Sequence, residues 1–393
     1  MFDERRWGEA RAKIESATQR SFHMIEEALA DVGPLKQSAQ KIRPRHVTAI
    51  SVVASDGGHN LIGAFNFLPL GAVQVVDSRG KVGFFDVIGP EDDTDELSQR
   101  HRDDPTSALG ILMRDLNVNW LRDLSSMIQK NPKGSGWMTV YRDLCEWATI
   151  YHLIRYKDHT SDTLILRDGL LRTKIFKDKF VVLGNLIKTH IEKVKREDRR
   201  NIYLVGLAKS TNVITRYGVA LDMGDVFPEG SPMYVPVPYA LQKKVYQWEE
   251  YIRLADDVAA LGVGSPPDDT PPGTTSSAKT ELPKFNIGEM HFVRFGNHRT
   301  DPVWTIDTLW FQKELAQTIL GSLLNDTISA FPIPCYPMSL QDADRHAQVS
   351  GLDREMLDKE LLGAIRNRLV PAQQAVLDAL PLNQNVAARR YNS

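Results

Sequence analysis

The segment TLILRDG, residues 163–169, is an apolar run that ends in Arg-Asp-Gly. An apolar run of this length indicates a buried strand, and Asp-Gly indicates a turn directly after it. Periodic apolar residues at about 179–196 then predict a helix, and NIYLVGLA at 201–208 predicts a second buried strand. The pattern is therefore typical of a strand, a helix and a further strand in one parallel sheet.

Upstream of this unit, residues 46–88 contain short β-rich runs separated by turn-forming residues. The runs VTAISVVA, LIGAFNFLPL, GAVQVV and KVGFFDVI are divided by Asp-Gly-Gly, Pro-Leu-Gly and Ser-Arg-Gly, which predicts three or four consecutive antiparallel strands. Helical periodicity follows at about 107–130 and 139–156. Antiparallel strands followed by alternating helices and parallel strands are the order expected of an RNase H-like α/β domain, a mixed sheet flanked by helices.

The remaining segments predict additions to this core. The core is predicted at 41–262 and includes a helix at 239–261. An N-terminal helical segment at 1–40, with an amphipathic helix at 7–31, precedes it. A loop rich in Pro, Gly, Ser and Thr at 263–284 and a C-terminal part at 285–393 follow it. We expect the loop to be disordered, since it has almost no apolar residues. We expect the C-terminal part to complete the α/β domain with strands at MHFVRF and VWTID, an apolar helix at 309–324 and helices from 340 to about 380.

The composition is that of an ordinary globular protein, with 42% hydrophobic and 25% charged residues. Lys plus Arg number 48 against 50 Asp plus Glu, so any contact with nucleic acid must use a local patch. The two cysteines, Cys145 and Cys335, suggest neither a disulfide framework nor a zinc site, which fits a reducing cytoplasm. The charged N-terminus and the lack of a run of about 18 apolar residues predict neither a signal peptide nor a membrane span.

Two carboxylates stand where predicted strands end. Asp56 follows VTAISVVAS and precedes Gly57-Gly58, and Asp168 follows TLILR and precedes Gly169. A lone Asp-Gly is usually only a turn, but ends of parallel strands meet at one edge of a sheet. Two close carboxylates repel, and a divalent cation relieves the repulsion while it polarises a phosphate and activates water. The pair therefore predicts half of a metal site.

A third carboxylate, Glu146, lies in RDLCEWATIYHLI beside an apolar helix face of Leu144, Trp147 and Ile150. It is either a solvated helix charge or a ligand directed to the same metal cluster. Asp143 is the local competitor for that role.

Several cations could hold phosphate. Lys209 follows the strand YLVGLA and either stabilises phosphate charge at the same sheet edge or caps the strand in solvent. Arg167, Arg172 and Lys174 flank the second Asp-Gly. They either form a solvated charged face or are the best local candidates for a patch that grips phosphate.

Five motifs in fixed order resemble the NurA family of nucleases. They are SDGG at 55–58, RDLCEWA at 142–148, LILRDGLLRTKIF at 164–176, LVGLAKST at 204–211 and YPMSLQDADRHA at 336–347. The resemblance implies a manganese-preferring, dimeric 5′ to 3′ DNA exonuclease with single-strand endonuclease activity, which works with a hexameric HerA-type ATPase. It implies metal-ligand and catalytic roles for Asp56, Glu146 and Asp168, and a site role for Tyr336, which we assign to DNA binding.

The C-terminal motif departs from the family pattern. The family often has His eight positions after the tyrosine, where this chain has Asp344, and His346 follows two positions later. Either residue could complete the metal site; Asp344 is a hard oxygen ligand suited to Mn²⁺ or Mg²⁺.

The function predicted from these observations is metal-dependent hydrolysis of DNA, in end processing or in antiphage defence. No GxxxxGK[ST] segment is present, so ATP hydrolysis would come from a partner. A non-catalytic DNA-binding or clamp subunit of the same translocase complex is the alternative, motivated by Asp344. A sugar-kinase-like phosphotransferase is disfavoured, because glycine-rich phosphate loops are absent.

Overall fold

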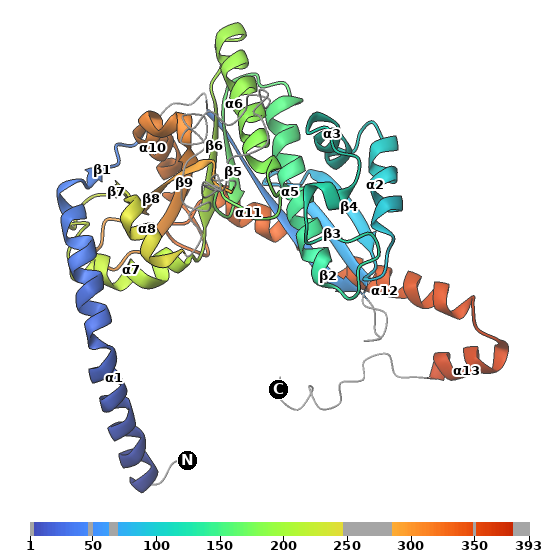
Figure 1. Cartoon of the computed structure of the whole chain (residues 1–393), viewed down its shortest axis with the longest axis horizontal. Helices are drawn as coiled ribbons and strands as arrows, with labels where there is room; N and C mark the ends of the chain where they lie inside the picture. The colour runs from blue at the N-terminus through green and yellow to red at the C-terminus, as the bar shows by residue number, and fades with distance from the viewer. Residues whose placement is uncertain (1–3, 46–49, 63–69, 247–284, 349–350, 380–393) are drawn as a thin grey trace, which may run out of the picture. The chain divides into compact units, whose positions relative to one another are not determined.

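The computed structural model describes residues 4–45, 50–62, 70–246, 285–348 and 351–379. Their strands form one mixed nine-stranded sheet in the order β1-β7-β8-β9-β6-β5-β2-β3-β4 (Figure 1). The strands are β1 (Gln40–Lys41), β2 (Ile50–Ile62), β3 (Leu70–Asp77), β4 (Val82–Ile88), β5 (Asp162–Asp168), β6 (Ile202–Ala208), β7 (Met233–Pro236), β8 (Gly288–Arg294) and β9 (Val303–Leu309).

Helices precede, connect and follow these strands. They are α1 (Glu4–Val32), η1 (Gly33–Gln37), α2 (Thr94–Asp103), α3 (Ala108–Asp115), α4 (Leu121–Leu124), α5 (Gly136–Arg155), α6 (Lys179–Glu197), α7 (Asn212–Met223), α8 (Tyr239–Val245), η3 (Trp310–Leu315), α10 (Ala316–Thr327), α11 (Met338–Ala347), α12 (Gly351–Arg366) and α13 (Pro371–Ala379). None of the helices in the described ranges is both long and apolar enough to cross a bilayer.

The sheet has the predicted mixed topology. Strands β2, β3 and β4 form an antiparallel meander. Strand β5 pairs in parallel with β6 after the α6 crossover, with Asp168 opposite Leu207. Strand β6 then pairs antiparallel with β9, which starts a second antiparallel run through β8 and β7 to β1. The prediction of an α/β mixed sheet flanked by helices is confirmed.

The prediction of a turn at Asp-Gly-Gly is wrong, because β2 runs without a break through Asp56, Gly57 and Gly58. The glycines serve close packing instead: a Cβ on Gly58 would clash with the main-chain oxygen of Ala347 in α11. Asp56 therefore lies within a strand, opposite Val76 of β3, and not at a strand end. A glycine inside a strand often marks such a close backbone approach.

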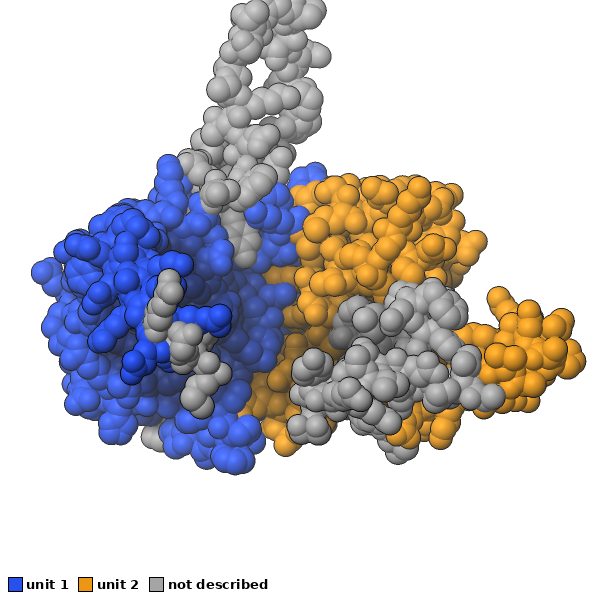
Figure 2. All heavy atoms as spheres, turned by 90° about the horizontal axis from the view of Figure 1, so that it is seen from below, with its two compact units in different colours: residues 1–52, 159–174, 178–338 blue, residues 53–158, 175–177, 339–393 orange. Residues whose placement is uncertain are grey.

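The chain divides into two compact units, drawn in separate colours in Figure 2. Unit 1 contains residues 1–52, 159–174 and 178–338, and unit 2 contains residues 53–158, 175–177 and 339–393. Both are assembled from separated segments, whereas the sequence predicts consecutive segments. The predicted segment boundaries stay predictions, and the loop at 263–284 lies outside the described residues.

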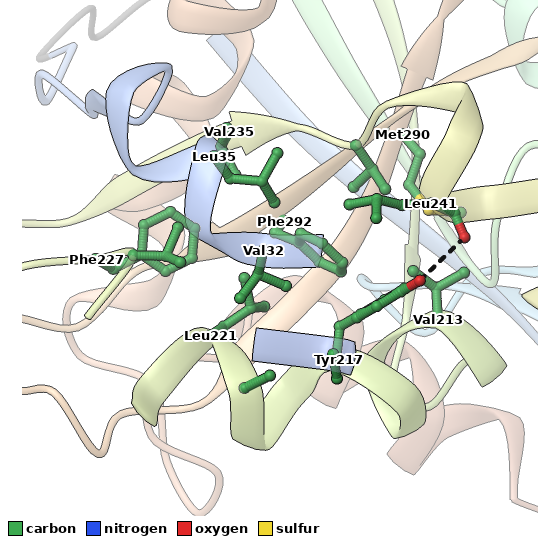
Figure 3. Packing of buried hydrophobic residues seen from close by; sticks show 14 of the residues in the cluster. Val32, Leu35, Val213, Tyr217, Leu221, Phe227, Val235, Leu241, Met290 and Phe292 are labelled. Carbon is green, nitrogen blue, oxygen red and sulfur yellow. Dashed lines mark hydrogen bonds between the residues drawn. The ribbon is translucent and has the colours of Figure 1, made fainter. Parts of the chain in front are cut away.

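The core of unit 1 joins the C-terminal end of α1 to α7 and the second antiparallel run. Val32 and Leu35 lie among Tyr217, Leu221 and Phe292 in this cluster, as Figure 3 shows. The N-terminal part of α1 is exposed, and its exposed apolar side chains are Trp7, Ile14, Phe22, Met24 and Ile25. The predicted amphipathic helix is therefore present, with only one end of its apolar face buried in unit 1.

In unit 2, α5 packs against β3 and β4 and contacts α3. The periodic segment at 107–130 contains the two short helices α3 and α4 rather than one helix. The helix predicted at 239–261 ends at Val245, and residues 247–261 lie outside the described ranges. The apolar segment at 309–324 begins as the 3₁₀ helix η3 and continues as α10.

Candidate functional site

In unit 1, the predicted position of Asp168 at the end of a buried strand is correct. Leu164, Ile165 and Leu166 are buried, and β5 ends at Asp168. Gly169 follows with φ +119°, a conformation that favours glycine, and a Cβ there would clash with the Arg167 guanidinium. Strand burial and the glycine turn together present the Asp168 carboxylate at the carboxyl end of β5.

Lys209 lies at the same edge of the sheet, one residue beyond the end of β6. Its Nζ atom lies 2.9 Å from Oδ2 of Asp168, and the two side chains are 40% and 19% exposed. This ion pair follows from the parallel pairing of β5 with β6, which brings the two strand ends together. Lys209 therefore binds the candidate ligand carboxylate, in addition to reaching solvent.

Tyr336 belongs to the same group of side chains. Its ring centre lies 5.8 Å from Nζ of Lys209 and 5.0 Å from the ring of Trp304. Trp304 also donates through Nε1 to the main-chain oxygen of Cys335, at 2.7 Å. Tyr336 is 1% exposed, so Lys209 rests over a buried aromatic ring, and sequence alone gave no signal for the role of Trp304.

Two of the predicted DNA-gripping cations have structural roles instead. Arg172 is fully buried: its guanidinium holds both oxygens of Asp307 and donates to Gln242. Arg167 is buried and donates through Nη1 to the main-chain oxygen of Leu170. Neither guanidinium is placed to grip a phosphate in solvent, which corrects the prediction for both residues. Lys174 is exposed, and its role stays a prediction.

In unit 2, the Glu146 carboxylate on α5 approaches β2 at Gly57, the residue after Asp56. Gly57, the neighbour of Asp56, leaves room for α5: a Cβ on Gly57 would lie 3.5 Å from Oε2 of Glu146 and 3.4 Å from Cγ of Arg142. The main-chain NH of Gly57 donates to Oδ1 of Asp56 at 2.8 Å. Glu146 is 4% exposed, which excludes the interpretation of a solvated helix charge.

Arg142 is a member of this cluster that the sequence prediction missed. Burial, the largest effect, lowers its pKa, but the charges of Asp143, Glu146 and Asp56 outweigh it, so that the pKa of Arg142 is raised. Arg142 lies four residues before Glu146 on one helix face, a spacing that could have indicated the contact. Asp143, the competitor of Glu146, is 28% exposed and bound by Arg142 through Nη2 at 2.7 Å.

The two candidates for a fourth ligand lie on α11. Asp344 is half-buried, whereas His346 is exposed. The His346 ring lies against the β3–β4 turn, where a Cβ on Gly80 would be 3.4 Å from Cε1, and its main-chain oxygen accepts from Gln74 at 3.0 Å. Residues two apart on a helix point in nearly opposite directions, so the two side chains cannot both face one metal ion.

Within the described ranges, no three His, Cys, Asp or Glu side chains lie close enough together to hold a metal ion. The donor chemistry nevertheless fits Mn²⁺ or Mg²⁺, because carboxylate oxygens are the ligands these ions prefer. The ligand set Asp56, Glu146 and Asp168, with Asp344 or His346, stays a prediction.

Among known proteins, the chain matches solved structures only. No family model matches the chain, and neither does any curated protein. The chain is similar along its length to two solved NurA structures. A crystal structure of NurA bound to dAMP and manganese covers 93% of this chain and 99% of its own, with 12% identity and a TM-score of 0.41. A second NurA crystal structure covers 91% and 98%, with 13% identity and a TM-score of 0.37. At these identities the likeness says nothing about individual side chains.

Proposed function

We propose that this chain is a metal-dependent DNA nuclease whose ions are held by Asp56, Glu146 and Asp168. The observation that carries the proposal is the buried Glu146 carboxylate, with Oε2 3.5 Å from the Cβ position of Gly57, together with Arg142, whose pKa the charges of Glu146 and Asp56 both raise. Two carboxylates that act on the same cation each raise the cost of ionising the other, and a bound divalent ion would relieve that cost. Arg142 supplies only part of the positive charge that would balance Asp56 and Glu146, because it also binds Asp143.

Bound Mn²⁺ or Mg²⁺ would polarise the scissile phosphate and lower the pKa of an attacking water. The chain's own residues would position the DNA and neutralise negative charge on its phosphates. Lys209 contributes a cation at the edge where Asp168 stands, held over the Tyr336 ring, and would stabilise negative charge on phosphate. Lys174, exposed six residues after Asp168, would contact the DNA backbone.

The test compares cleavage of linear DNA with Mn²⁺ by the wild-type chain and by Asp56→Asn, Glu146→Gln and Asp168→Asn. Each replacement keeps the shape of the side chain and removes its charge, so we expect at least about a 100-fold loss of cleavage rate. Asp143→Asn is the matched control on α5 and should retain most activity. Intact DNA with the wild-type chain, alone and with a HerA-type ATPase, would overturn the proposal; binding without cleavage would indicate a clamp subunit.

The finer features of the activity are also proposals. We propose 5′ to 3′ exonuclease and single-strand endonuclease activity, in end processing or antiphage defence in the cytoplasm. Because the sequence has no GxxxxGK[ST] segment, DNA translocation would require a motor of the HerA type. Strand-specific end labels would reveal the polarity, and coupled ATP-dependent degradation would reveal the motor.

We further propose that the chain forms a homodimer through the exposed apolar face of α1. Trp7, Ile14 and Ile25 lie on the helix face that continues into the buried Val32, so the face is long and only partly covered within unit 1. The apolar helix α10 offers no comparable surface, because Ile319, Leu320 and Leu323 are buried in unit 1. Size-exclusion chromatography of Trp7→Asp with Ile14→Asp should show a monomer; an unchanged dimer would exclude this face.

A further inference from the structure

The loop between α10 and α11 exposes apolar side chains in unit 1. Phe331 is 77% exposed, the largest value among the large apolar side chains in the described ranges, and Ile328 and Ile333 are 68% and 42% exposed. A single exposed apolar residue needs no explanation. Several in one short loop indicate a surface that something else covers.

The loop is held in place at its C-terminal end. Pro332, Pro334 and Pro337 each restrict the backbone to one range of φ. The hydrogen bond from Trp304 to the Cys335 oxygen and the burial of Tyr336 attach the loop to β9. Phe331 is therefore presented by a restrained segment, so that little conformational entropy would be lost when a ligand binds it.

The same loop carries Tyr336 of the candidate site. Tyr336 lies under Lys209, and Lys209 binds Asp168. Phe331 is five residues before Tyr336, so their Cα atoms are separated by at most about 18 Å. This length corresponds to roughly five base steps of about 3.4 Å each. A strand whose phosphate reached Lys209 would thus have bases within reach of Phe331.

We propose that Phe331 is a stacking platform for a base of single-stranded DNA next to the cleavage site. The inference rests on the proposed nuclease function and adds the residue that would hold the unpaired end. Proteins that bind single strands combine cations along the backbone with aromatic rings on which bases stack, and every base has a face suited to such stacking. In unit 1, Lys209 over the Tyr336 ring and Phe331 on the loop that carries Tyr336 would provide these two elements.

The test measures binding of a single-stranded oligonucleotide that contains 2-aminopurine, in EDTA so that no cleavage occurs. Phe331→Ala should weaken binding by roughly 5- to 150-fold, the effect of losing one stacked base. Phe331→Trp should bind as tightly as the wild-type chain, and the DNA should quench the fluorescence of the introduced indole ring. Ile328→Ala, a matched exposed position in the same loop, should change the affinity less than about twofold if stacking is the cause.

Because Phe331 is mostly in solvent, its replacement should leave the stability of the fold unchanged, and equal melting temperatures of the variants would verify this. With Mn²⁺ present, Phe331→Ala should raise KM for single-stranded DNA more than it lowers kcat. If Phe331→Ala binds single-stranded DNA as tightly as the wild-type chain, and the wild-type chain cleaves DNA, the inference about Phe331 is overturned while the proposed nuclease function stands. Loss of a dimer instead of DNA affinity would also overturn it, in favour of a protein contact. A wild-type chain that neither binds nor cleaves DNA would refute the proposed function itself.

Discussion

Arg172 and Asp307 form a fully buried ion pair, with 2.7 Å between Nη2 and Oδ1 and 2.9 Å between Nε and Oδ2. Oδ2 of Asp307 also accepts from the main-chain NH of Leu171 at 3.0 Å. The pair thus fixes the segment that follows Asp168 onto β9. This arrangement explains why a cation beside the second Asp-Gly is unavailable to DNA.

Removing one partner of this pair should destabilise the protein strongly. Asp307→Asn leaves a buried guanidinium without its counter-charge, so we expect the free energy of unfolding to fall by about 3–5 kcal/mol. Urea denaturation measures the loss. Arg172→Met combined with Asp307→Leu should cost less than either single change, and Lys174→Ala, at an exposed position, serves as the control. A single variant as stable as the wild type would contradict this role.

Gly58→Ala tests the close approach of β2 to α11. The added Cβ would clash with the Ala347 oxygen, so the free energy of unfolding should fall by roughly 1–3 kcal/mol. Gly363→Ala in α12 is the matched control: nothing lies within 4 Å of the new Cβ, and the change should stabilise by about 0.5–1 kcal/mol. Equal effects of the two substitutions would show that β2 and α11 do not pack in this way.

A buried histidine predicts the acid sensitivity of unit 2. Tyr141 donates to Oδ2 of Asp86 at 2.6 Å. The His101 ring is hydrogen-bonded to the same group, with Nε2 2.7 Å from the Tyr141 oxygen and Nδ1 2.9 Å from the Ser107 oxygen. Burial, the largest effect, lowers its pKa from 6.5 to about 4, against the opposing charge of Asp86.

His101 takes up a proton at a higher pH in the unfolded chain than in the folded protein. The contribution of neutral His101 to the free energy of unfolding is therefore full above pH 6.5 and is lost as the pH falls through about 4. His101→Gln should therefore show a smaller fall in the free energy of unfolding between these pH values than the wild type, by up to about 3 kcal/mol. NMR titration of the imidazole checks the pKa directly. A His101 pKa near 6.5 in the folded protein would refute the assignment.

Lys209→Met separates a role in catalysis from a role in stability. The ion pair with Asp168 is partly exposed, so its loss should change the free energy of unfolding by less than about 1 kcal/mol. The loss of a cation at the site should lower kcat/KM for DNA cleavage by roughly 100-fold. Lys174→Met should lower affinity with a smaller effect on kcat. Full activity in Lys209→Met would exclude its action on phosphate.

The sequence predicted the parts of the fold that depend on local apolar patterns. The strand before Asp168, the α6 crossover and strand β6 follow from apolar runs and helical spacing, and they place Asp168 and Lys209 at one edge. Helix α2 was missed because it is polar. Its signals were the Asp93 cap, which accepts from the NH groups of Asp95 and Glu96, and the acidic first turn. Helix α7 and strand β7 were not predicted either.

The errors at the site arise from long-range contacts. Gly57-Gly58 resembles a turn locally, but the approach of α5 and α11 uses the glycines within a strand. Arg172 resembles a surface cation until Asp307, far along the chain, is placed beside it. Local sequence cannot specify either partner, because both are brought by elements distant in sequence.

The most direct test of the central claim is a crystal structure with Mn²⁺, in which anomalous scattering locates the ion. We expect carboxylate oxygens of Asp56, Glu146 and Asp168 to bind it at about 2.1 Å, and Asp168→Asn to lose the peak. If the Asp56 and Asp168 oxygens instead lie more than about 8 Å apart and the manganese is bound elsewhere, they cannot share a metal cluster, and the proposed active site is contradicted.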